Sequence, residues 1–417
     1  MQLNDVCKSM LAGEQGRARQ WAVEHQLQVG RMFDAEDMVA VTQAHMMADP
    51  ESLGEPGVAL FEDFAELPAS DRQLRVPLIT DPRGVDLNCY RPLGQTEAMA
   101  DLERRFIAAA DTLGILLTNT CINYQTIMPP APGEHVAFGD TGVVIYSNSV
   151  CAARSNFEGG PSALAAALTG YTPRYGLHLQ ESRKATRRFL VDFMPENLTQ
   201  WGVLGAVIGR QCGSYWEVPL IEGIKRSPTP DELKHFGAAM ASYGSTPLFH
   251  MLGVTPESFA VEDILPTENK ELPSTTVTCE DCLQLQAPFV EEGAKVDVVV
   301  FAAPQLSLIE MQQVASLCSG RQLHASTDMY VCTSSAVYAD ASSAGFVDSI
   351  ESFGAKVLQG TCFYQQYAAE IREANGWSTL LSNSTKIVNI LGGYGYQPLL
   401  ASMQECVDAA VSGRCST

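Results

Sequence analysis

The chain has 417 residues, and its 27 Lys and Arg residues against 48 Asp and Glu residues give a formal net charge of −21. Apolar residues make up 46% and charged residues 18%, which is the composition of a globular protein and excludes wholesale disorder. So acidic a chain lacks the basic footprint of a nucleic-acid-binding protein and repels anionic membrane surfaces, although a local basic pocket for a small anion is compatible with it. At ~100–200 residues per domain, the length suggests two to three domains.

Targeting signals and cysteine usage indicate the compartment. The N-terminus shows no apolar segment followed by small residues, so we expect no secretory signal. The most apolar runs, Trp201–Gly209 and Val296–Pro304, are about nine residues long, whereas a membrane-spanning helix needs ~20. We therefore expect a cytoplasmic chain. Its 12 cysteines are then reduced, and each is a core residue, a metal ligand or a nucleophile.

The first two thirds of the chain combine helical spacing with short apolar runs. Apolar positions recur with helical spacing in residues 3–31 and 95–113, and Gly114 is a natural stop for the second helix. Gly159 to Ser162 open a further helix, with a proline in its first turn. Short strands are predicted at Val39–Val41, Val76–Ile79, Ile115–Thr118 and Val143–Ser147.

The last third alternates β-branched runs with helices. Strands are predicted at Val296–Ala302, Asp328–Cys332, Lys356–Leu358 and Lys386–Ile390, and helices at Leu308–Leu317 and 341–353. This alternation predicts an α/β fold with mostly parallel sheets. The polar residues 271–290 are predicted to be a linker between an N-terminal α/β body at 1–270, expected to hold two subdomains, and a C-terminal α/β domain at 291–417.

Two cysteines and one alanine follow predicted strands. They are Cys121, Ala303 and Cys362. Ligands bind at the carboxyl ends of the strands in open α/β sheets, so these positions are candidates for a site. A lone cysteine in a loop is more often structural than a metal ligand, and spacing alone leaves both interpretations open.

The pair Cys279 and Cys282 has the spacing of a zinc or redox motif. Zinc needs a second pair of ligands, and no other cysteine or histidine pair has the right spacing. The pair also lies in the predicted linker rather than between a strand and a helix, as a redox motif should. We interpret it as incidental.

The segment from Tyr146 to Gly160 is rich in hydrogen-bond donors. The helix that begins at Gly159 and Gly160 can bind a carboxylate or phosphate through its free N–H groups, and the alternative is a tight turn that packs the helix. Arg154 can clamp a carboxylate, and the alternative is a solvated surface arginine. The candidate substrate-binding residues of this segment are Ser147, Asn148, Ser149, Arg154, Asn156, Gly159 and Gly160.

Glu134 and His135 place an acid beside an imidazole. Adjacent residues rarely face the same site, so the pair is weak by itself as a candidate for acid–base chemistry. The sequence contains no nucleophile elbow, Walker loop or zincin helix. The glycines at 392, 393 and 395 lack a following βαβ unit, which argues against an NAD-dependent enzyme.

Several segments together resemble the catalytic large subunit of the aconitase X family. They are GEHVAF at 133–138, YSNS at 146–149, ARSN at 153–156, EGGPSALAAALTG at 158–170, TPRYGLH at 172–178 and LFHMLGVTP at 248–256. The likeness runs from LAGEQG at 11–16 to NSTK at 383–386, which is nearly the whole chain. The resemblance implies an aconitase-like α/β fold around a central cleft. It also implies a dehydratase with an iron–sulfur cluster and a separate small swivelling-domain subunit as partner, because no part of the chain is left for that domain.

The resemblance implies that Cys121 and Cys362 are ligands of the cluster. The family's third cysteine precedes a proline, and Ala303 stands at that position here. Three thiolates hold a cubane with one open iron, so two thiolates leave the type open between 2Fe–2S and 3Fe–4S or 4Fe–4S. Candidate catalytic residues are Glu134, His135 and Lys386, and further substrate-binding candidates are Asp81, Pro82 and Ser384.

Known members of the family act on cis-3-hydroxy-L-proline or on mevalonate 5-phosphate. The acidic residues Asp49 and Glu51 disfavour a phosphate, whereas they and Asp81 can pair with a substrate nitrogen. We therefore expect a dehydratase that converts cis-3-hydroxy-L-proline to 1-pyrroline-2-carboxylate. The alternatives are a mevalonate 5-phosphate dehydratase, or a cluster-free member that binds a small acid or serves as a scaffold. No nucleic acid or membrane partner is expected.

Overall fold

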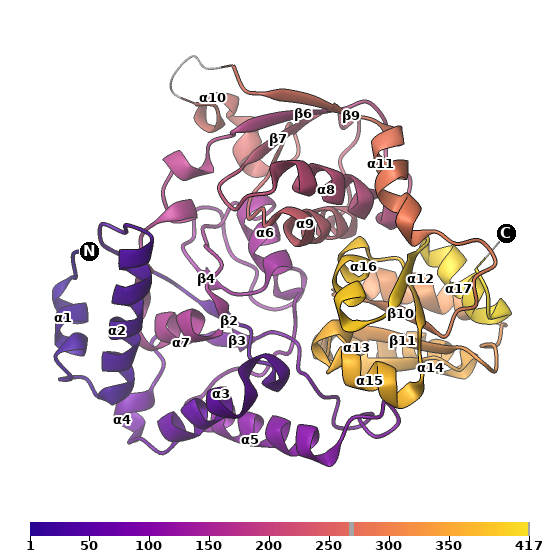
Figure 1. The fold of residues 1–417 in the computed structure, drawn as a ribbon. Helices are drawn as coiled ribbons and strands as arrows, with labels where there is room; N and C mark the ends of the chain where they lie inside the picture. The colour runs from indigo at the N-terminus through magenta and orange to yellow at the C-terminus, as the bar shows by residue number, and fades with distance from the viewer. Residues whose placement is uncertain (267–270, 416–417) are drawn as a thin grey trace.

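The computed structural model describes residues 1–266 and 271–415, which form three α/β parts (Figure 1). We call them the N-terminal part (residues 1–183), the middle part (184–289) and the C-terminal part (294–415). One apolar core runs from the middle part into the C-terminal part and includes Cys121 and Cys362, while the N-terminal part has a core of its own. The two cysteines therefore lie where the three parts meet.

The N-terminal part is built on a three-stranded parallel sheet. Its order is β3 (Leu78–Thr80), β2 (Ala44–Met46) and β4 (Ala137–Phe138). A separate antiparallel pair joins β1 (Met38–Ala40) to β5 (Tyr171–Pro173). The helices are α1 (Asp5–Leu11), α2 (Arg17–Met32), α3 (Pro50–Ala65), α4 (Ala69–Arg72), α5 (Glu97–Leu113), α6 (Thr141–Ser149) and α7 (Gly159–Thr169).

The middle part contains a four-stranded parallel sheet and two tightly packed helices. The strand order is β8 (His250–Met251), β7 (Pro219–Glu222), β6 (Arg187–Val191) and β9 (Ser274–Val277). The helices are α8 (Leu198–Cys212), α9 (Pro230–Gly244), α10 (Val261–Ile264) and α11 (Cys279–Gln286). A Cβ on Gly205 would lie 2.1 Å from the carbonyl oxygen of Phe236, so only glycine allows α8 to approach α9 this closely.

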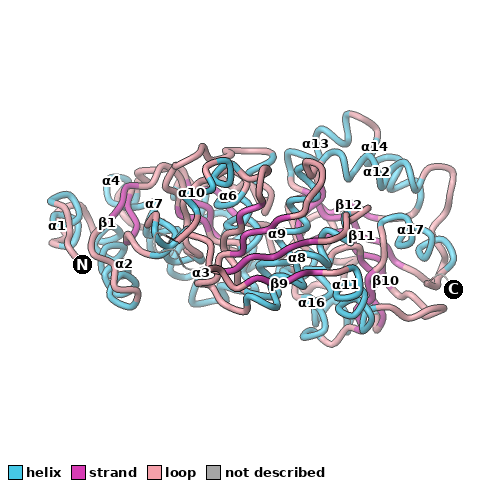
Figure 2. Tube along the Cα trace, turned by 90° about the horizontal axis from the view of Figure 1, so that it is seen from above, coloured by secondary structure: helices cyan, strands magenta, loops and turns pink. Residues whose placement is uncertain are grey.

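The C-terminal part is a five-stranded parallel sheet covered by helices (Figure 2). Its strand order is β12 (Lys356–Gln359), β11 (Asp328–Thr333), β10 (Val298–Leu306), β13 (Thr379–Ser382) and β14 (Gln397–Leu400). The helices are α12 (Leu308–Cys318), α13 (Ser335–Ser343), α14 (Phe346–Phe353), α15 (Ala368–Asn375), α16 (Thr385–Leu391) and α17 (Met403–Ser412). The predicted α/β fold with mostly parallel sheets is confirmed.

Two predicted strands are helices. Val143–Ser147 belongs to α6, because Asp140 caps that helix by accepting from the N–H groups of Gly142 and Val143. Lys386–Ile390 belongs to α16, which Ser384 caps. Both helices are buried on most sides, and a helix without a polar face gives the same apolar run as a buried strand.

Three further expectations differ in detail. The predicted helix at 341–353 covers the end of α13 and all of α14, because Gly345 adopts a φ of 77° between them. The predicted strand Ile115–Thr118 makes a single bridge, between Leu116 and Ile79. The predicted linker 271–290 contains β9 and α11, because β9 pairs with β6 and so belongs to the sheet of the middle part. In the described residues, no helix has both the length and the apolar character that crossing a membrane requires.

Candidate active site

Two buried cysteines from distant parts of the chain are in contact. Cys121 follows the bridge at Leu116, and Cys362 follows β12. Hydrogen bonding with Cys362, together with burial, raises the pKa of the Cys121 thiol well above its ordinary value. Only 5% of Cys121 and 1% of Cys362 are exposed. The fold thus forms a buried pair of thiols.

The end of β10 lies against this pair. The peptide bond between Ala303 and Pro304 is cis, and Ala303 has a φ of 52°. The hydroxyl of Ser384 donates to the carbonyl of Ala303 over 2.6 Å, and the backbone N–H of Gln305 donates to the sulfur of Cys121 over 3.3 Å. The segment that the sequence placed after a strand therefore does reach the thiols.

A buried lysine and a carboxylate stand next to the thiols. The ammonium of Lys386 donates to Asp140 over 3.1 Å and to the hydroxyl of Thr141 over 3.3 Å. Burial alone would lower the pKa of Lys386, but the negative charge of Asp140 and the neighbouring Cys121 and Cys362 raise it. Burial would raise the pKa of Asp140, but Lys386 and hydrogen bonds to its carboxylate lower it. Both groups are therefore charged at neutral pH.

Asp81 is a second carboxyl group beside Asp140. Its Oδ2 accepts from the amide of Gln365 over 2.8 Å, and its Oδ1 lies 3.5 Å from Nε2 of His45. That nitrogen of His45 also lies 2.8 Å from the carbonyl oxygen of Thr120. Burial and the neighbouring charge of Asp140 raise the pKa of Asp81 well above its ordinary value. Asp81 can therefore hold a proton at neutral pH.

Buried polar atoms without partners surround these groups. Among the described residues, Oδ1 of Asp81, Oε1 of Gln365 and both amide atoms of Asn123 make no hydrogen bond. Asn123 is fully buried and lies two residues after Cys121. Buried polar groups are normally paired with protein or water, so these atoms are free to bind water or a polar ligand.

Two cysteines of the site are candidate ligands of a metal–sulfur group. Thiolates are soft ligands that select iron–sulfur clusters, zinc and similar ions. Cys121 and Cys362 can supply two of them, and the methyl group of Ala303 supplies none. Among the described residues, no three or more histidine, cysteine, aspartate or glutamate side chains are grouped so that they could hold a metal ion, so further ligands would have to come from outside this set.

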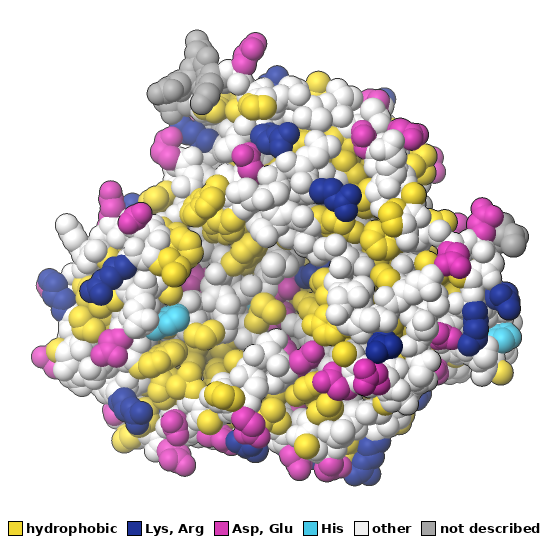
Figure 3. All heavy atoms as spheres, viewed as in Figure 1, with side chains coloured by type: hydrophobic (Ala, Val, Ile, Leu, Met, Phe, Trp, Pro, Cys, Tyr) yellow, Lys and Arg dark blue, Asp and Glu magenta, His cyan; other side chains and the backbone are white. Residues whose placement is uncertain are grey.

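A cleft of about 1170 Å³ separates the middle and C-terminal parts. Its lining comprises the beginnings of α8, α9, α12 and α17, one side of α13, and the rings of Tyr124 and Tyr146. Tyr124 lies three residues after Cys121, and its buried hydroxyl has no partner among the described residues. The cleft therefore approaches the segment that carries the first thiol. In the view of Figure 3 the surface is hollowed where the three parts meet.

The structure does not join Glu134 and His135 to the thiols. The carboxylate of Glu134 accepts from the hydroxyl of Thr42 and the amide of Gln43. Nδ1 of His135 lies 2.9 Å from Nδ1 of His178. Burial and nearby cations lower the pKa of His135 to about 4, so it is neutral at pH 7. These contacts place the pair in a separate polar cluster.

Arg154 belongs to the same separate cluster. Its guanidinium donates to the carbonyl of His178 over 3.3 Å and to the side chain of Gln180. It is neither a freely solvated arginine nor one that reaches the thiols in these contacts.

Three substrate-binding candidates make side-chain hydrogen bonds within the fold, whereas the buried hydroxyl of Ser147 has no partner among the described residues. The amide of Asn148 donates to the carbonyls of Ser155 and Pro247, and the hydroxyl of Ser149 accepts from the N–H of Phe249. Asn156 accepts from Leu177 and Tyr215 and donates to Tyr175, while Ser147 is fully buried within α6. The role of Ser147, Asn148, Ser149 and Asn156 in contacting substrate stays a prediction, and the hydrogen bonds of the last three lie within the fold in this structure.

The glycines at the start of α7 serve packing. A Cβ on Gly160 would lie 2.7 Å from the carbonyl oxygen of Met47, so the backbone of the N-terminal part already covers this helix end. Gly159 has a φ of 54°, which favours glycine. The tight-turn alternative explains both residues.

Some of the remaining predicted residues lie beside the thiols, and others do not. Asp81, Ser384 and Lys386 lie in the group around the thiols, and Pro82 follows Asp81 directly. Cys279 and Cys282 lie on α11, the first exposed and the second buried. The sequence reasoning missed Asp140 and Gln365. The position of Asp140 between β4 and a helix was the one available signal.

Three models of the aconitase X family match the chain in succession. The first domain matches residues 1–181, the second domain residues 185–286 and the third domain residues 296–412. These limits agree with the three parts of the structure.

Related proteins carry two different names. The phosphomevalonate dehydratase large subunit of Methanothermobacter thermautotrophicus is 34% identical over 92% of this chain and 92% of its own length. The cis-3-hydroxy-L-proline dehydratase of Pseudomonas aeruginosa is 30% identical over 98% of this chain and 69% of its own length. The crystal structure of Thermococcus kodakaraensis aconitase X in its holo-form superposes with a TM-score of 0.87 at 28% identity, covering 98% of this chain and 100% of that one. These matches and the shared three-part architecture show that the chain belongs to the aconitase X family.

Proposed function

We propose that the chain is the large subunit of a hydro-lyase that removes water from a small hydroxy acid. The related proteins named above are dehydratases, which supports hydro-lyase activity. The observation that carries the proposal is the buried thiol pair beside a charged lysine and a carboxyl group that can hold a proton. This combination provides a ligand set, a cation and an acid in one buried place.

Cys121 and Cys362 hold the iron–sulfur group in this proposal. Two thiolates leave the type open between 2Fe–2S and 3Fe–4S or 4Fe–4S, and each type needs further ligands because Ala303 supplies none. When bound, iron supplies a Lewis acid toward the leaving hydroxyl group.

In this proposal Lys386 binds the substrate, and Asp81 donates a proton. The raised pKa of Lys386 keeps it positively charged, so it binds a substrate carboxylate and does not act as the base. The protonated carboxyl of Asp81 gives a proton to the departing hydroxyl group. Glu134 and His135 contact a separate polar cluster, so we propose that the base that removes the α-proton comes from the partner subunit.

We propose cis-3-hydroxy-L-proline as the substrate and 1-pyrroline-2-carboxylate as the product. Asp49 and Glu51 are acidic groups on one segment of the N-terminal part, and they suit a substrate nitrogen better than a phosphate. Burial raises the pKa of Glu51 to about 7, so a bound cation can favour the charged form of its carboxyl group. Mevalonate 5-phosphate is the second candidate, favoured by the similar length and 34% identity of the relative with that name.

A separate small swivelling-domain subunit completes the enzyme in this proposal. Several relatives of matching length are named large subunits, which implies a second subunit for them. The cis-3-hydroxy-L-proline dehydratase of Pseudomonas aeruginosa is longer, and this chain covers 69% of it. We further propose that the complex works in the cytoplasm, with reduced thiols.

The test is a dehydration assay on the complex with its small subunit, purified without oxygen. We expect turnover of cis-3-hydroxy-L-proline, and a Lys386→Met variant to lose about 10²–10³-fold in kcat. The ammonium of Lys386 lies 5.6 Å from the ring centre of Tyr364. Lys356→Met is the matched control, since the ammonium of Lys356 lies 6.0 Å from the ring centre of Tyr330 but Lys356 is an exposed residue of β12. Turnover of mevalonate 5-phosphate alone would move the assignment to the second candidate. No dehydration of either acid by an iron-loaded complex would reject the function and favour a member that only binds an acid or serves as a scaffold.

A further inference from the structure

One glutamine connects all three parts of the protein at the thiol pair. Gln305 is fully buried at the end of β10. Its side-chain oxygen accepts from the N–H of Cys121 over 3.3 Å, and its own backbone N–H donates to the sulfur of Cys121 over 3.3 Å. Gln305 is therefore hydrogen-bonded to Cys121 through both its backbone and its side chain.

The side-chain amide of Gln305 also reaches both segments that carry the thiols. Its nitrogen lies 3.2 Å from the carbonyl oxygen of Asn119, 3.1 Å from that of Thr361 and 3.3 Å from that of Thr333. Asn119 lies two residues before Cys121, and Thr361 directly precedes the other cysteine. One planar amide thus ties the two loops to each other and to β11.

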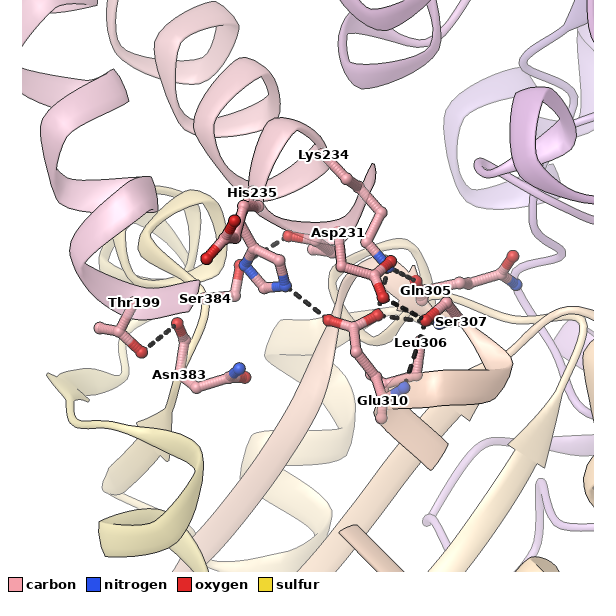
Figure 4. A network of polar contacts seen from close by, with 12 residues as sticks. Thr199, Asp231, Lys234, His235, Gln305, Leu306, Ser307, Glu310, Asn383 and Ser384 are labelled. Carbon is pink, nitrogen blue, oxygen red and sulfur yellow. Dashed lines mark hydrogen bonds and ion pairs between the residues drawn. The ribbon is translucent and has the colours of Figure 1, made fainter. Parts of the chain in front are cut away.

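A buried ion-pair network contacts the backbone of Gln305 (Figure 4). The ammonium of Lys234 donates to the backbone carbonyl of Gln305 over 3.1 Å and contacts Asp231 and Glu310. Glu310 also accepts from His235 over 2.7 Å and from the N–H of Ser307 over 2.8 Å. Lys234 and His235 come from α9, whereas Glu310 comes from α12, so the network fixes the middle part to the end of β10.

From these contacts we infer that Gln305 is the positioning residue that sets the separation and direction of the two thiols. The inference rests on the proposed function, in which Cys121 and Cys362 hold a metal–sulfur group. Residues that orient ligands in this way change metal affinity by about 10–100-fold when they are removed. The side chain of Gln305 touches the ligand-bearing loops and not the reacting atoms, so it acts through the cysteines.

The experiment measures Cd²⁺ binding to the metal-free chain. Sulfur-to-cadmium charge transfer absorbs in the ultraviolet, and subtracting the spectrum of a Cys121→Ser, Cys362→Ser double variant isolates the signal of this pair. In Gln305→Ala we expect the dissociation constant for that signal to rise about 10–100-fold. Gln305→Met removes the same side-chain hydrogen bonds while keeping most of the volume, and it decides the test if the alanine variant does not fold.

The matched control is Gln26→Ala. Gln26 is also a buried glutamine, 2% exposed, and donates to Thr169 over 3.0 Å and to the carbonyl of Tyr171 over 2.6 Å, within the N-terminal part. It should lose stability without changing the cadmium signal. The inference is overturned if Gln305→Met binds Cd²⁺ as the unaltered chain does, if Gln26→Ala weakens binding equally, or if the unaltered chain gives no signal that depends on the pair. An anaerobic chain that contains no iron but shows the Gln305-dependent cadmium signal would reject the proposed function and leave the inference standing.

Discussion

Glu103 provides a pH-dependent test of the fold beneath the site. It lies on α5 with its side chain fully buried, and its Oε2 accepts from the N–H groups of Gly84 and Val85, each over 3.2 Å. These residues belong to the loop that follows Asp81. Burial raises the pKa of Glu103 to about 8, with Arg83 opposing the rise. The carboxyl group is therefore neutral in the folded protein at pH 5 and charged above pH 8.

The magnitude follows from linkage. The folded pKa of about 8 lies above the ordinary 4.5, so the contribution of Glu103 to stability is fully present below pH 4.5 and is lost as the pH rises through 8. At 1.36 kcal/mol per pKa unit, the loss approaches about 5 kcal/mol above pH 8, of which about 4 kcal/mol falls between pH 5 and pH 8. A Glu103→Gln variant does not ionise, and its side-chain oxygen can accept the same two hydrogen bonds.

The assay is urea unfolding of both proteins at pH 5, 6.5 and 8. We expect the variant to match the unaltered chain at pH 5 and to exceed it increasingly as the pH rises. Glu97→Gln is the control on the same helix, because hydrogen bonds from Tyr90, Arg91 and Arg104 lower the pKa of Glu97 to about 2 and it stays ionised over this range. A difference between Glu103→Gln and the unaltered chain that does not change with pH would refute the reasoning.

Three further predictions concern packing and the site. Lys234→Met leaves the buried charge of Glu310 without its ammonium partner. The free energy of unfolding, measured by heat or urea, should fall by about 3–5 kcal/mol. An unchanged unfolding midpoint would contradict the role of the ion-pair network. Gly205→Ala forces a Cβ to within 2.1 Å of a carbonyl oxygen on α9, and the free energy of unfolding should fall by about 1–3 kcal/mol or more. In the control Gly393→Ala the new Cβ meets nothing within 4 Å, so the loss should be far smaller. Equal losses in the two variants would contradict the packing of α8 on α9. Ala303→Cys supplies the missing thiol, and iron analysis should show more iron per chain; an unchanged iron content would mean that this position does not face the group.

The family resemblance, and not spacing alone, predicted the thiol pair. Cys121 and Cys362 each follow a short apolar run, which made them candidates for a site, but a lone cysteine in a loop is also compatible with a structural role. The structure brings the two into contact although the segments before them belong to different sheets, since Leu116 bridges to β3 and Cys362 follows β12. The same resemblance pointed to Lys386, which lies beside them. Contact between loops of different sheets is a tertiary feature, so spacing along the chain could not predict it.

Residues that act through tertiary contacts could not be found in this way. Gln305 and Asp140 have no distinctive spacing, and their roles arise from groups far away in the sequence. In the donor-rich run, the amide of Asn148 donates to the carbonyls of Ser155 and Pro247, which lie outside its helix, and the sequence pattern does not show such pairing either. Polar residues in an apolar run are equally compatible with a binding site and with a buried hydrogen-bond network.

The iron and acid-labile sulfide content of the anaerobically purified chain tests the central claim most directly. The claim predicts iron and sulfide in the unaltered chain and in a Cys279→Ser, Cys282→Ser control, which removes a pair of cysteines on α11. It predicts that a Cys121→Ser, Cys362→Ser variant loses both elements together with its visible absorption. Equal iron and sulfide in all three proteins, or neither element in the unaltered chain, would contradict the claim that this thiol pair holds an iron–sulfur group.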